Sequence, residues 1–308
     1  MEADGPEALD KPVQFFTGKG GVGKSTVISA VALRAARRGL RPLIVELGAH
    51  TSSAHLVGDT PIAYEPTEIM TGVHATRVLF EPALVDYVAS RLRLRTVAKL
   101  VSRNASLRRL FVAAPGVDEI VTMHRVAQLG TSRSWGPVLV DLESTGNALM
   151  FFDLPKVLDV FLEDGPLRQV VDGATRLLGD AERSVVHIVT VPEPLIVRET
   201  IDLHRGLSTR DGVHLGHLFI NRIPPMWLDE NSRVRIRETI RTVANDDLST
   251  GRLRLAEHLI DRWEVAQRCI DGLRHDVPLP TVRLPTRHTP TEQTVAYLCD
   301  ALDNGGIE

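Results

Sequence analysis

The sequence predicts an α/β fold, with a doubly wound, mostly parallel sheet as its core and a helical insertion. Short apolar runs alternate with helical stretches over most of the 308 residues. This order is typical of parallel strands joined by helices that cover both faces of the sheet. The alternation stops between residues 54 and 135, where helical patterns dominate. We therefore expect the core over residues 13–53 and 136–303, with a mainly helical insertion over 54–135.

The elements follow from the apolar periodicity, after an acidic segment 1–12 with two prolines that predicts a flexible tail. In the core, strands are expected at 13–16, 42–45, 137–141, 184–191, 215–221 and 281–284. Core helices are expected at 27–38, 148–162, 166–178, 195–207, 230–243, 252–273 and 291–302. Within the insertion, the sequence pattern predicts one strand at 73–80 and helices at 83–92, 96–112 and 117–129. Residues 149–180 are assigned to the core, with packing on the helical subdomain as the alternative.

The bulk composition excludes several classes of protein. Hydrophobic residues make up 43% of the chain and charged residues 24%, which is ordinary for a globular protein. The net charge of −3 gives no clear signal for nucleic acid. No apolar stretch approaches the ~18–20 residues that span a bilayer, and no signal peptide is recognisable, so we expect a cytoplasmic protein. The isolated Cys269 and Cys299 argue against a thiolate zinc site and a disulfide framework.

A glycine-rich segment between the first strand and the first helix carries the strongest chemical signal. Gly18 to Ser25 fits G-x-x-x-x-G-K-[ST], the phosphate-binding loop. Glycines allow backbone N–H groups to converge on phosphate oxygens, and the helix N-terminus adds a positive dipole end. Lys24 is expected to reach the β- and γ-phosphates, and the Ser25 hydroxyl to bind Mg²⁺. The predicted nucleotide-binding set is Gly18, Lys19, Gly20, Gly21, Val22, Gly23, Lys24, Ser25 and Thr26.

A second signal is Asp141, which ends the apolar run 137–140. Downstream of a phosphate loop, this is the Walker B arrangement, in which the carboxylate holds a water of the Mg²⁺ shell opposite the loop hydroxyl. The alternative is a structural aspartate at a strand end. The sequence thus predicts Ser25 and, through water, Asp141 as the metal-binding residues.

Two motifs resemble one family. Lys19 directly follows the first glycine, so that G-K-G-G-V-G-K-S-T resembles the deviant phosphate loop of the ArsA/MinD/ParA group of ATPases. Residues 141–155 resemble the D-T-A-P-T-G-H-T-L-R…L-P signature of the ArsA-type ATPases. The matching residues are Asp141, Thr145, Gly146, Leu149, Leu154 and Pro155, while Asn147, Ala148 and Met150 replace the His, Thr and Arg. The likeness is closer to the short bacterial anion-transporting ATPases, some of which occur as paired paralogues.

The resemblance implies a P-loop NTPase core and a dimeric, Mg-ATP-dependent switch ATPase, as a homodimer or as a heterodimer with a paralogue. Lys19 would reach across the interface to the nucleotide of the partner. Asn221 matches the family asparagine that contacts adenine, and Pro285 and Thr286 match the loop that flanks it. The alternative is that Asn221 is a turn residue that ends the strand. A protein partner or client is implied without being identified.

The chain departs from the family pattern after the second strand. The D-P-A of the family falls on Gly48, Ala49 and His50, so the carboxylate that orients the attacking water is missing. Glu46 and Glu143 are the nearby substitutes, and we expect slow hydrolysis by a catalytic set of Lys19, Lys24, Glu46 and Asp141. The first alternative is a nucleotide-binding scaffold subunit that does not hydrolyse ATP. The second, weakened by an acidic C-terminus, is a positioning ATPase of the MinD/ParA type.

One basic stretch remains without an assigned role. Its members, in a window with no acidic residue, are Arg91, Arg93, Arg95, Lys99, Arg103, Arg108 and Arg109. A solvated helix face and a docking face for an acidic partner or anionic lipid both fit this pattern.

Overall fold

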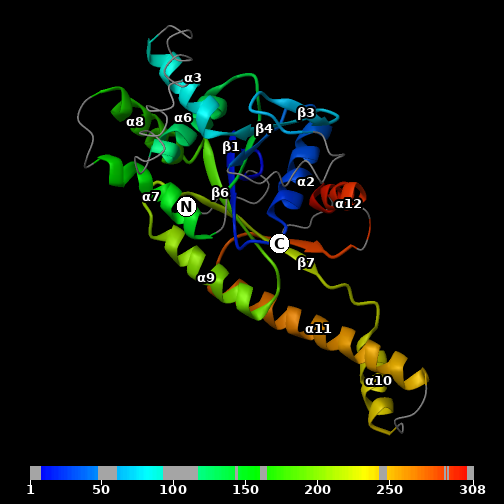
Figure 1. The fold of residues 1–308 in the computed structure, drawn as a ribbon. Helices are drawn as coiled ribbons and strands as arrows, with labels where there is room; N and C mark the ends of the chain where they lie inside the picture. Colours follow the sequence, from blue (N-terminus) through cyan, green and yellow to red (C-terminus); the bar gives the residue numbers. More distant parts are fainter. Residues whose placement is uncertain are drawn as a thin grey trace.

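An eight-stranded sheet runs through the molecule in the order β3-β4-β2-β5-β1-β6-β7-β8. The computed structural model describes residues 8–47, 61–92, 117–142, 145–159, 165–242, 248–287, 289 and 291–303 (Figure 1). Neighbouring strands pair in parallel except β3 and β4. The strands are β1 (Val13–Thr17), β2 (Leu43–Leu47), β3 (Thr67–Met70), β4 (Val73–Val78), β5 (Val138–Asp141), β6 (Ser184–Thr190), β7 (Leu215–Ile223) and β8 (Thr281–Pro285).

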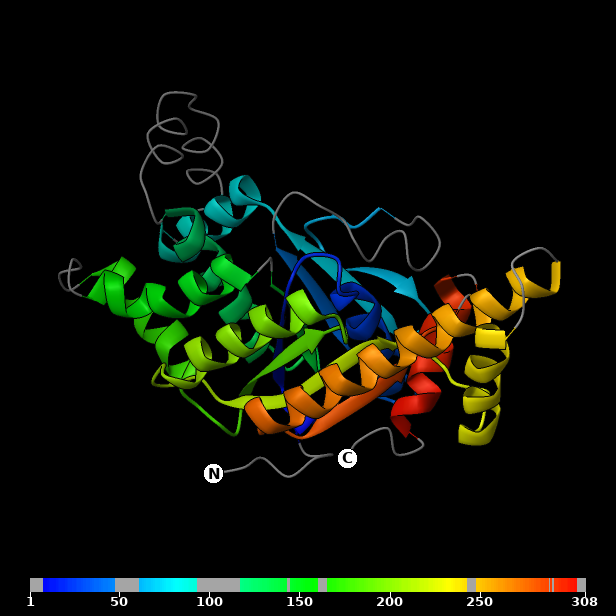
Figure 2. The ribbon, with the colours of Figure 1, turned by 90° about the horizontal axis from the view of Figure 1, so that it is seen from below.

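Helices cover both faces of this sheet (Figures 1 and 2). In chain order they are α2 (Lys24–Arg37), α3 (Phe80–Leu92), α6 (Val117–Thr131), α7 (Thr145–Asp159), α8 (Pro166–Leu178), α9 (Pro194–Ser208), α10 (Glu230–Thr242), α11 (Leu248–Asp276) and α12 (Thr291–Asp303). One buried cluster joins α2 and α12 to the sheet, and a second joins α3, α6, α7, α8, α9 and α11 to its other face. The doubly wound, mostly parallel α/β architecture expected from the sequence is confirmed.

The segment expected to be a mainly helical insertion contributes to the core sheet. β4 pairs in parallel with β2, and β3 pairs with β4 in antiparallel orientation, so residues 67–78 extend the sheet. The strand expected at 73–80 is confirmed as β4, whereas β3 at the edge of the sheet was not expected, because a strand of four residues carries too little apolar alternation to be recognised. The described helices α3 and α6 pack on the sheet: Ala83 and Val126 join the same buried cluster as Phe15.

Residues 149–180 also pack against this common core. Phe151 and Phe152 of α7 lie with their ring centroids 6.0 and 5.7 Å from that of Phe15 on β1. Leu177 of α8 belongs to the same buried cluster. Residues 149–180 thus pack on the central strands and on α6 at once, because all of these elements bury their apolar side chains in one cluster.

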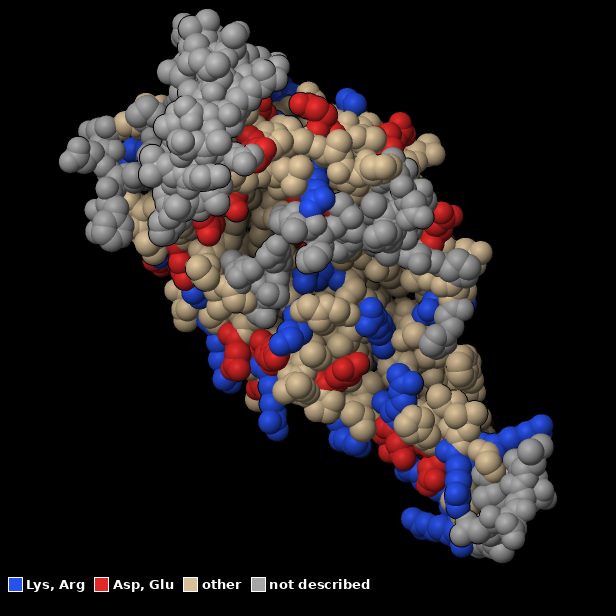
Figure 3. Space-filling model, in the orientation of Figure 1, with Lys and Arg blue, Asp and Glu red and all other residues tan. Residues whose placement is uncertain are grey.

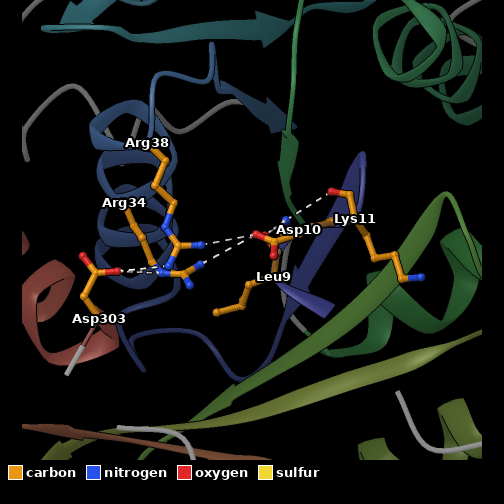
Figure 4. Close-up of polar contacts among 7 residues, drawn as sticks. Leu9, Asp10, Lys11, Arg34, Arg38 and Asp303 are labelled. Carbon is orange, nitrogen blue, oxygen red and sulfur yellow. Dashed lines mark hydrogen bonds and ion pairs between the residues drawn. The ribbon is translucent and has the colours of Figure 1, made fainter. Parts of the chain in front are cut away.

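Polar contacts join both ends of the described chain to α2 (Figure 4). Arg34, whose side chain is 6% exposed, lies 3.0 Å from Asp303 of α12 through Nε and 4.0 Å from Asp10 through Nη1. Arg38 approaches the same two carboxylates. Leu9 is buried, and its carbonyl accepts a hydrogen bond of 2.8 Å from Gln14 Nε2. The tail boundary expected at residue 12 is therefore too late, since residues 8–12 are folded onto the core.

The hairpin of α10 and the first half of α11 projects away from the sheet (Figures 1 and 2). Leu255 of α11 is 60% exposed, and Trp227, in the segment that leads into α10, is 80% exposed. Figure 3 shows lysine and arginine side chains gathered near the end of this hairpin, while both signs of charge mix over the rest of that face. Among the described helices, none combines the length and the apolar character that crossing a membrane requires.

Candidate functional site

The glycine loop between β1 and α2 adopts a backbone that other residues do not readily adopt. Gly18 has φ +150°, and a Cβ there would lie 2.1 Å from the Val189 carbonyl oxygen of β6. Gly23 has φ +89°, and a Cβ there would lie 2.4 Å from Nδ2 of Asn221. Both positions require glycine because of backbone conformation and close contact together. The loop thus packs tightly against β6 and β7.

The start of α2 has the features of an anion-binding helix N-terminus. Gly23 precedes the helix without a side-chain cap, and the first turn contains no acidic residue. The first N–H groups of a helix have no intrahelical acceptor, and the helix dipole favours negative charge there. Lys24 Nζ donates to the carbonyl oxygens of Gly18 at 3.1 Å and Lys19 at 3.4 Å, so its ammonium lies over the loop. This arrangement suits a phosphate group.

Ser25 and Asp141 meet at the carboxyl ends of two neighbouring strands. β1 and β5 run in parallel with Phe16 in register with Asp141. Ser25 Oγ donates a hydrogen bond of 2.7 Å to Asp141 Oδ2. The two oxygens therefore lie side by side at the base of the loop, as the sequence predicts.

The electrostatic environment of Asp141 opposes its ionisation. The pKa of Asp141 is raised to about 6: burial is the largest cause and the nearby Glu46 adds to the rise, while the hydrogen bond from Ser25 and the charge of Lys24 act in the opposite direction. Glu46 lies in register with Asp141 on β2 and is 2% exposed. A carboxylate that lacks sufficient positive charge around it gains stability from a cation.

These residues fit a magnesium ion. Mg²⁺ prefers oxygen ligands and usually combines one or two protein groups with waters and the phosphates of a substrate. Ser25 and Asp141 supply such a pair of oxygens. Within the described residues, no group of three or more His, Cys, Asp or Glu side chains is arranged to hold a metal.

Asn221 and the segment after β8 lie at the same edge of the sheet. Asn221 Nδ2 donates to the Val22 carbonyl oxygen at 2.9 Å, and Asn221 Oδ1 accepts from the backbone N–H of Arg222 at 2.9 Å. Thr286 N–H donates to the Ile223 carbonyl oxygen at 2.8 Å. β7 continues to Ile223, so the alternative in which Asn221 ends the strand is wrong. The observed contacts make Asn221 a brace for the loop.

Lys19 has a partner that sequence reasoning missed. Its Nζ lies 2.8 Å from Oε1 of Glu199 on α9. The two residues are 180 positions apart, and Glu199 belongs to no motif, so no local pattern could have revealed the pair. Gly48, Ala49, His50, Glu143 and the basic stretch beyond Arg91 lie outside the described residues, and the Arg91 side chain is not described.

Comparison with known proteins places this site in a family. The family model described as "Anion-transporting ATPase" (ArsA_ATPase) matches residues 12–172, a span that contains the glycine loop and Asp141. The chain belongs to the ArsA ATPase family. The family and its ATPase-named relatives indicate ATP hydrolysis at the level of the family.

Three relatives show the range of the similarity. ATPase BagA of Mycobacterium tuberculosis (strain ATCC 25618 / H37Rv) is 27% identical over 304 residues, covering 89% of this chain and 87% of the relative. Protein Rv2184c of the same strain is 29% identical over 265 residues, covering 72% and 61%. ATPase ASNA1 homolog 1 of Paramecium tetraurelia is 27% identical over 151 residues, covering 47% and 44%.

Gly18 and Gly20 differ in whether the structure has room for a side chain, and this difference gives a first prediction. Gly18→Ala should lower the free energy of unfolding by about 2–4 kcal/mol, because it combines a backbone clash with an unfavourable φ. Gly20→Ala is the matched control, since a Cβ there meets nothing within 4 Å, and should change stability by less than about 1 kcal/mol. Denaturant unfolding of both variants measures the difference. Equal effects would contradict the observed packing of the loop.

The raised pKa of Asp141 gives a second prediction. The folded-state pKa of about 6 exceeds the ordinary value of 3.8, so the folded state binds more protons than the unfolded state between these pH values. Its contribution to stability is therefore present below pH 4 and lost as pH rises through 6. Asp141→Asn should stabilise the nucleotide-free protein by about 1–3 kcal/mol at pH 7.5. The gain should shrink toward zero near pH 4, as measured by denaturant unfolding; a gain independent of pH would refute the assignment.

Proposed function

We propose that this chain is a dimeric Mg-ATP-dependent switch ATPase that couples its nucleotide state to the binding of a protein partner or client. The hydrogen bond between Ser25 Oγ and Asp141 Oδ2 at the N-terminus of α2 carries the proposal. It brings the two oxygen donors of a Mg-nucleotide site together beside a loop shaped for phosphate. The family membership supports ATP as the nucleotide.

The proposed roles follow from the positions of the residues. Backbone N–H groups from Gly20 to Thr26 bind phosphate oxygens, and Lys24 turns from the loop carbonyls to the β- and γ-phosphates. Ser25 binds Mg²⁺ directly and Asp141 through a water, and the ion neutralises charge on the phosphates. Asn221 keeps the loop in place and directs its remaining amide hydrogen toward adenine, beside Pro285 and Thr286.

Glu46 is proposed to hold the attacking water. It is the described carboxylate next to Asp141 in the sheet, and Gly48 stands where the family has its aspartate. Burial of Glu46 limits how far its side chain reaches, which supports slow turnover. The same burial favours the second candidate function, a nucleotide-binding scaffold without hydrolysis.

Lys19 is proposed to act in trans, as the deviant loop implies. In this proposal two chains, identical or paralogous, face each other across their loops, and each Lys19 binds the nucleotide of the partner subunit. Phosphoryl transfer depends mainly on positioning and on stabilising charge, so a second lysine supplied by dimer formation links association to turnover.

The phosphate-loop roles are tested by paired lysine variants. Lys24→Ala should weaken ATP binding about 10- to 100-fold, because a charge-assisted hydrogen bond to phosphate is lost. Lys19→Ala should keep ATP affinity and lose turnover and ATP-dependent dimerisation. Calorimetric titration with Mg-ATP, together with phosphate-release assays, measures both. Undiminished ATP affinity in Lys24→Ala would rule out the assignment of the loop.

Hydrolysis and scaffold functions are separated by Glu46→Gln, a change that keeps the shape of the side chain. If Glu46 holds the water, phosphate release should fall about 100-fold or more, while Mg-ATP affinity is retained. Lys24→Ala gives the background rate. Wild-type phosphate release that does not exceed this background would support the scaffold instead.

A further inference from the structure

We propose that Glu199 is a positioning residue that retains Lys19 in its own subunit and thereby restrains assembly of the ATP-bound dimer. The inference rests on the function proposed above, in which Lys19 acts across the dimer interface. Lys19 Nζ and Glu199 Oε1 lie 2.8 Å apart, and the two side chains are 44% and 32% exposed. Lys19 cannot keep this contact and also reach a nucleotide in the partner subunit.

Glu199 stands on a firmly anchored part of α9. The neighbouring Thr200 places its hydroxyl 2.7 Å from that of Thr190 at the end of β6, and both residues are buried. β6 in turn pairs with β1, which leads into the loop, and its Val189 packs against Gly18. The carboxylate is therefore held in place relative to the loop. The lysine has a long, flexible stem, so separation occurs by movement of Lys19.

The second carboxylate oxygen strengthens the dependence of Glu199 on Lys19. Glu199 Oε2 is buried, and no hydrogen-bond donor reaches it within the described part of the chain. A carboxylate with one oxygen removed from water loses part of its hydration, so its negative charge depends on the ion pair with Lys19 for stabilisation. Departure of Lys19 thus leaves the carboxylate poorly compensated. The pair therefore favours the arrangement in which Lys19 stays with its own subunit.

The expected size of the effect follows from the exposure of the pair. Ion pairs that remain partly solvated contribute modestly, and their loss shifts an equilibrium about two- to fivefold. Neutralising Glu199 releases Lys19, so less ATP is needed to form the dimer. ATP binding to the isolated subunit is unchanged, because Glu199 acts through Lys19.

The experiment compares Glu199→Gln with Asp202→Asn, which removes the same charge from an exposed position on α9. The ATP concentration at half-maximal dimerisation is measured by sedimentation for the full chain, each variant also being made in a Lys19→Ala background. Glu199→Gln should lower that concentration two- to fivefold and raise turnover at subsaturating ATP, whereas Asp202→Asn should change neither. In the Lys19→Ala background, which loses ATP-dependent dimerisation, Glu199→Gln should not restore it.

The outcomes separate the two proposals. An unchanged or higher midpoint for Glu199→Gln, together with loss of dimerisation in Lys19→Ala, overturns the restraint and leaves the proposed function in place. Full turnover and dimerisation in Lys19→Ala overturn the proposed function itself. If Glu199→Gln does not fold, Glu199→Asp shortens the side chain with its charge kept, and a midpoint that is not lowered then overturns the restraint.

Discussion

The parallel pairing of β1 with β5 is the constraint on which the candidate site depends. It sets Phe16 beside Asp141 and so brings the carboxylate within 2.7 Å of Ser25 at the start of the next helix. Neither residue forms a site alone, because a strand-end aspartate and a helix-start serine are ordinary features of α/β proteins. Their juxtaposition at the carboxyl edge of the sheet creates the oxygen pair that suits Mg²⁺, and burial raises the pKa of Asp141 to about 6.

The glycine loop is held by groups from three other parts of the chain. Val189 of β6 approaches Gly18, Asn221 of β7 binds the Val22 carbonyl, and Glu199 of α9 binds Lys19. These contacts give the loop a defined shape before any nucleotide binds, which lowers the conformational entropy lost on binding. The contact with Glu199 differs from the other two, because an exposed lysine can leave it. The loop therefore combines a rigid backbone with one mobile cationic side chain.

The residues matched by the ArsA family model include the glycine loop and Asp141. The residues that surround them are known from the structure of this chain alone. Glu46 lies buried beside Asp141, and the sequence has Gly48 rather than a carboxylate two residues after Glu46. Binding and hydrolysis place different demands on a site, since phosphate binding needs the loop amides and lysine, whereas turnover also needs an oriented water. A chain can therefore keep the first set of groups while the second changes, and the proposed slow hydrolysis follows from this difference.

The sequence by itself determined the α/β class, most core elements and the glycine loop, because apolar periodicity and the phosphate-loop spacing are local patterns. It also paired Ser25 with Asp141, since strand ends of a parallel sheet meet at one edge. Tertiary structure alone decided that β3 forms the edge of the sheet and that the strand expected at 73–80 pairs with β2, because strand pairing depends on contacts between distant segments. It also decided that Asn221 braces Val22 and that Lys19 binds Glu199. Contacts between residues so far apart in sequence depend on how whole strands and helices pack, and no short pattern encodes them.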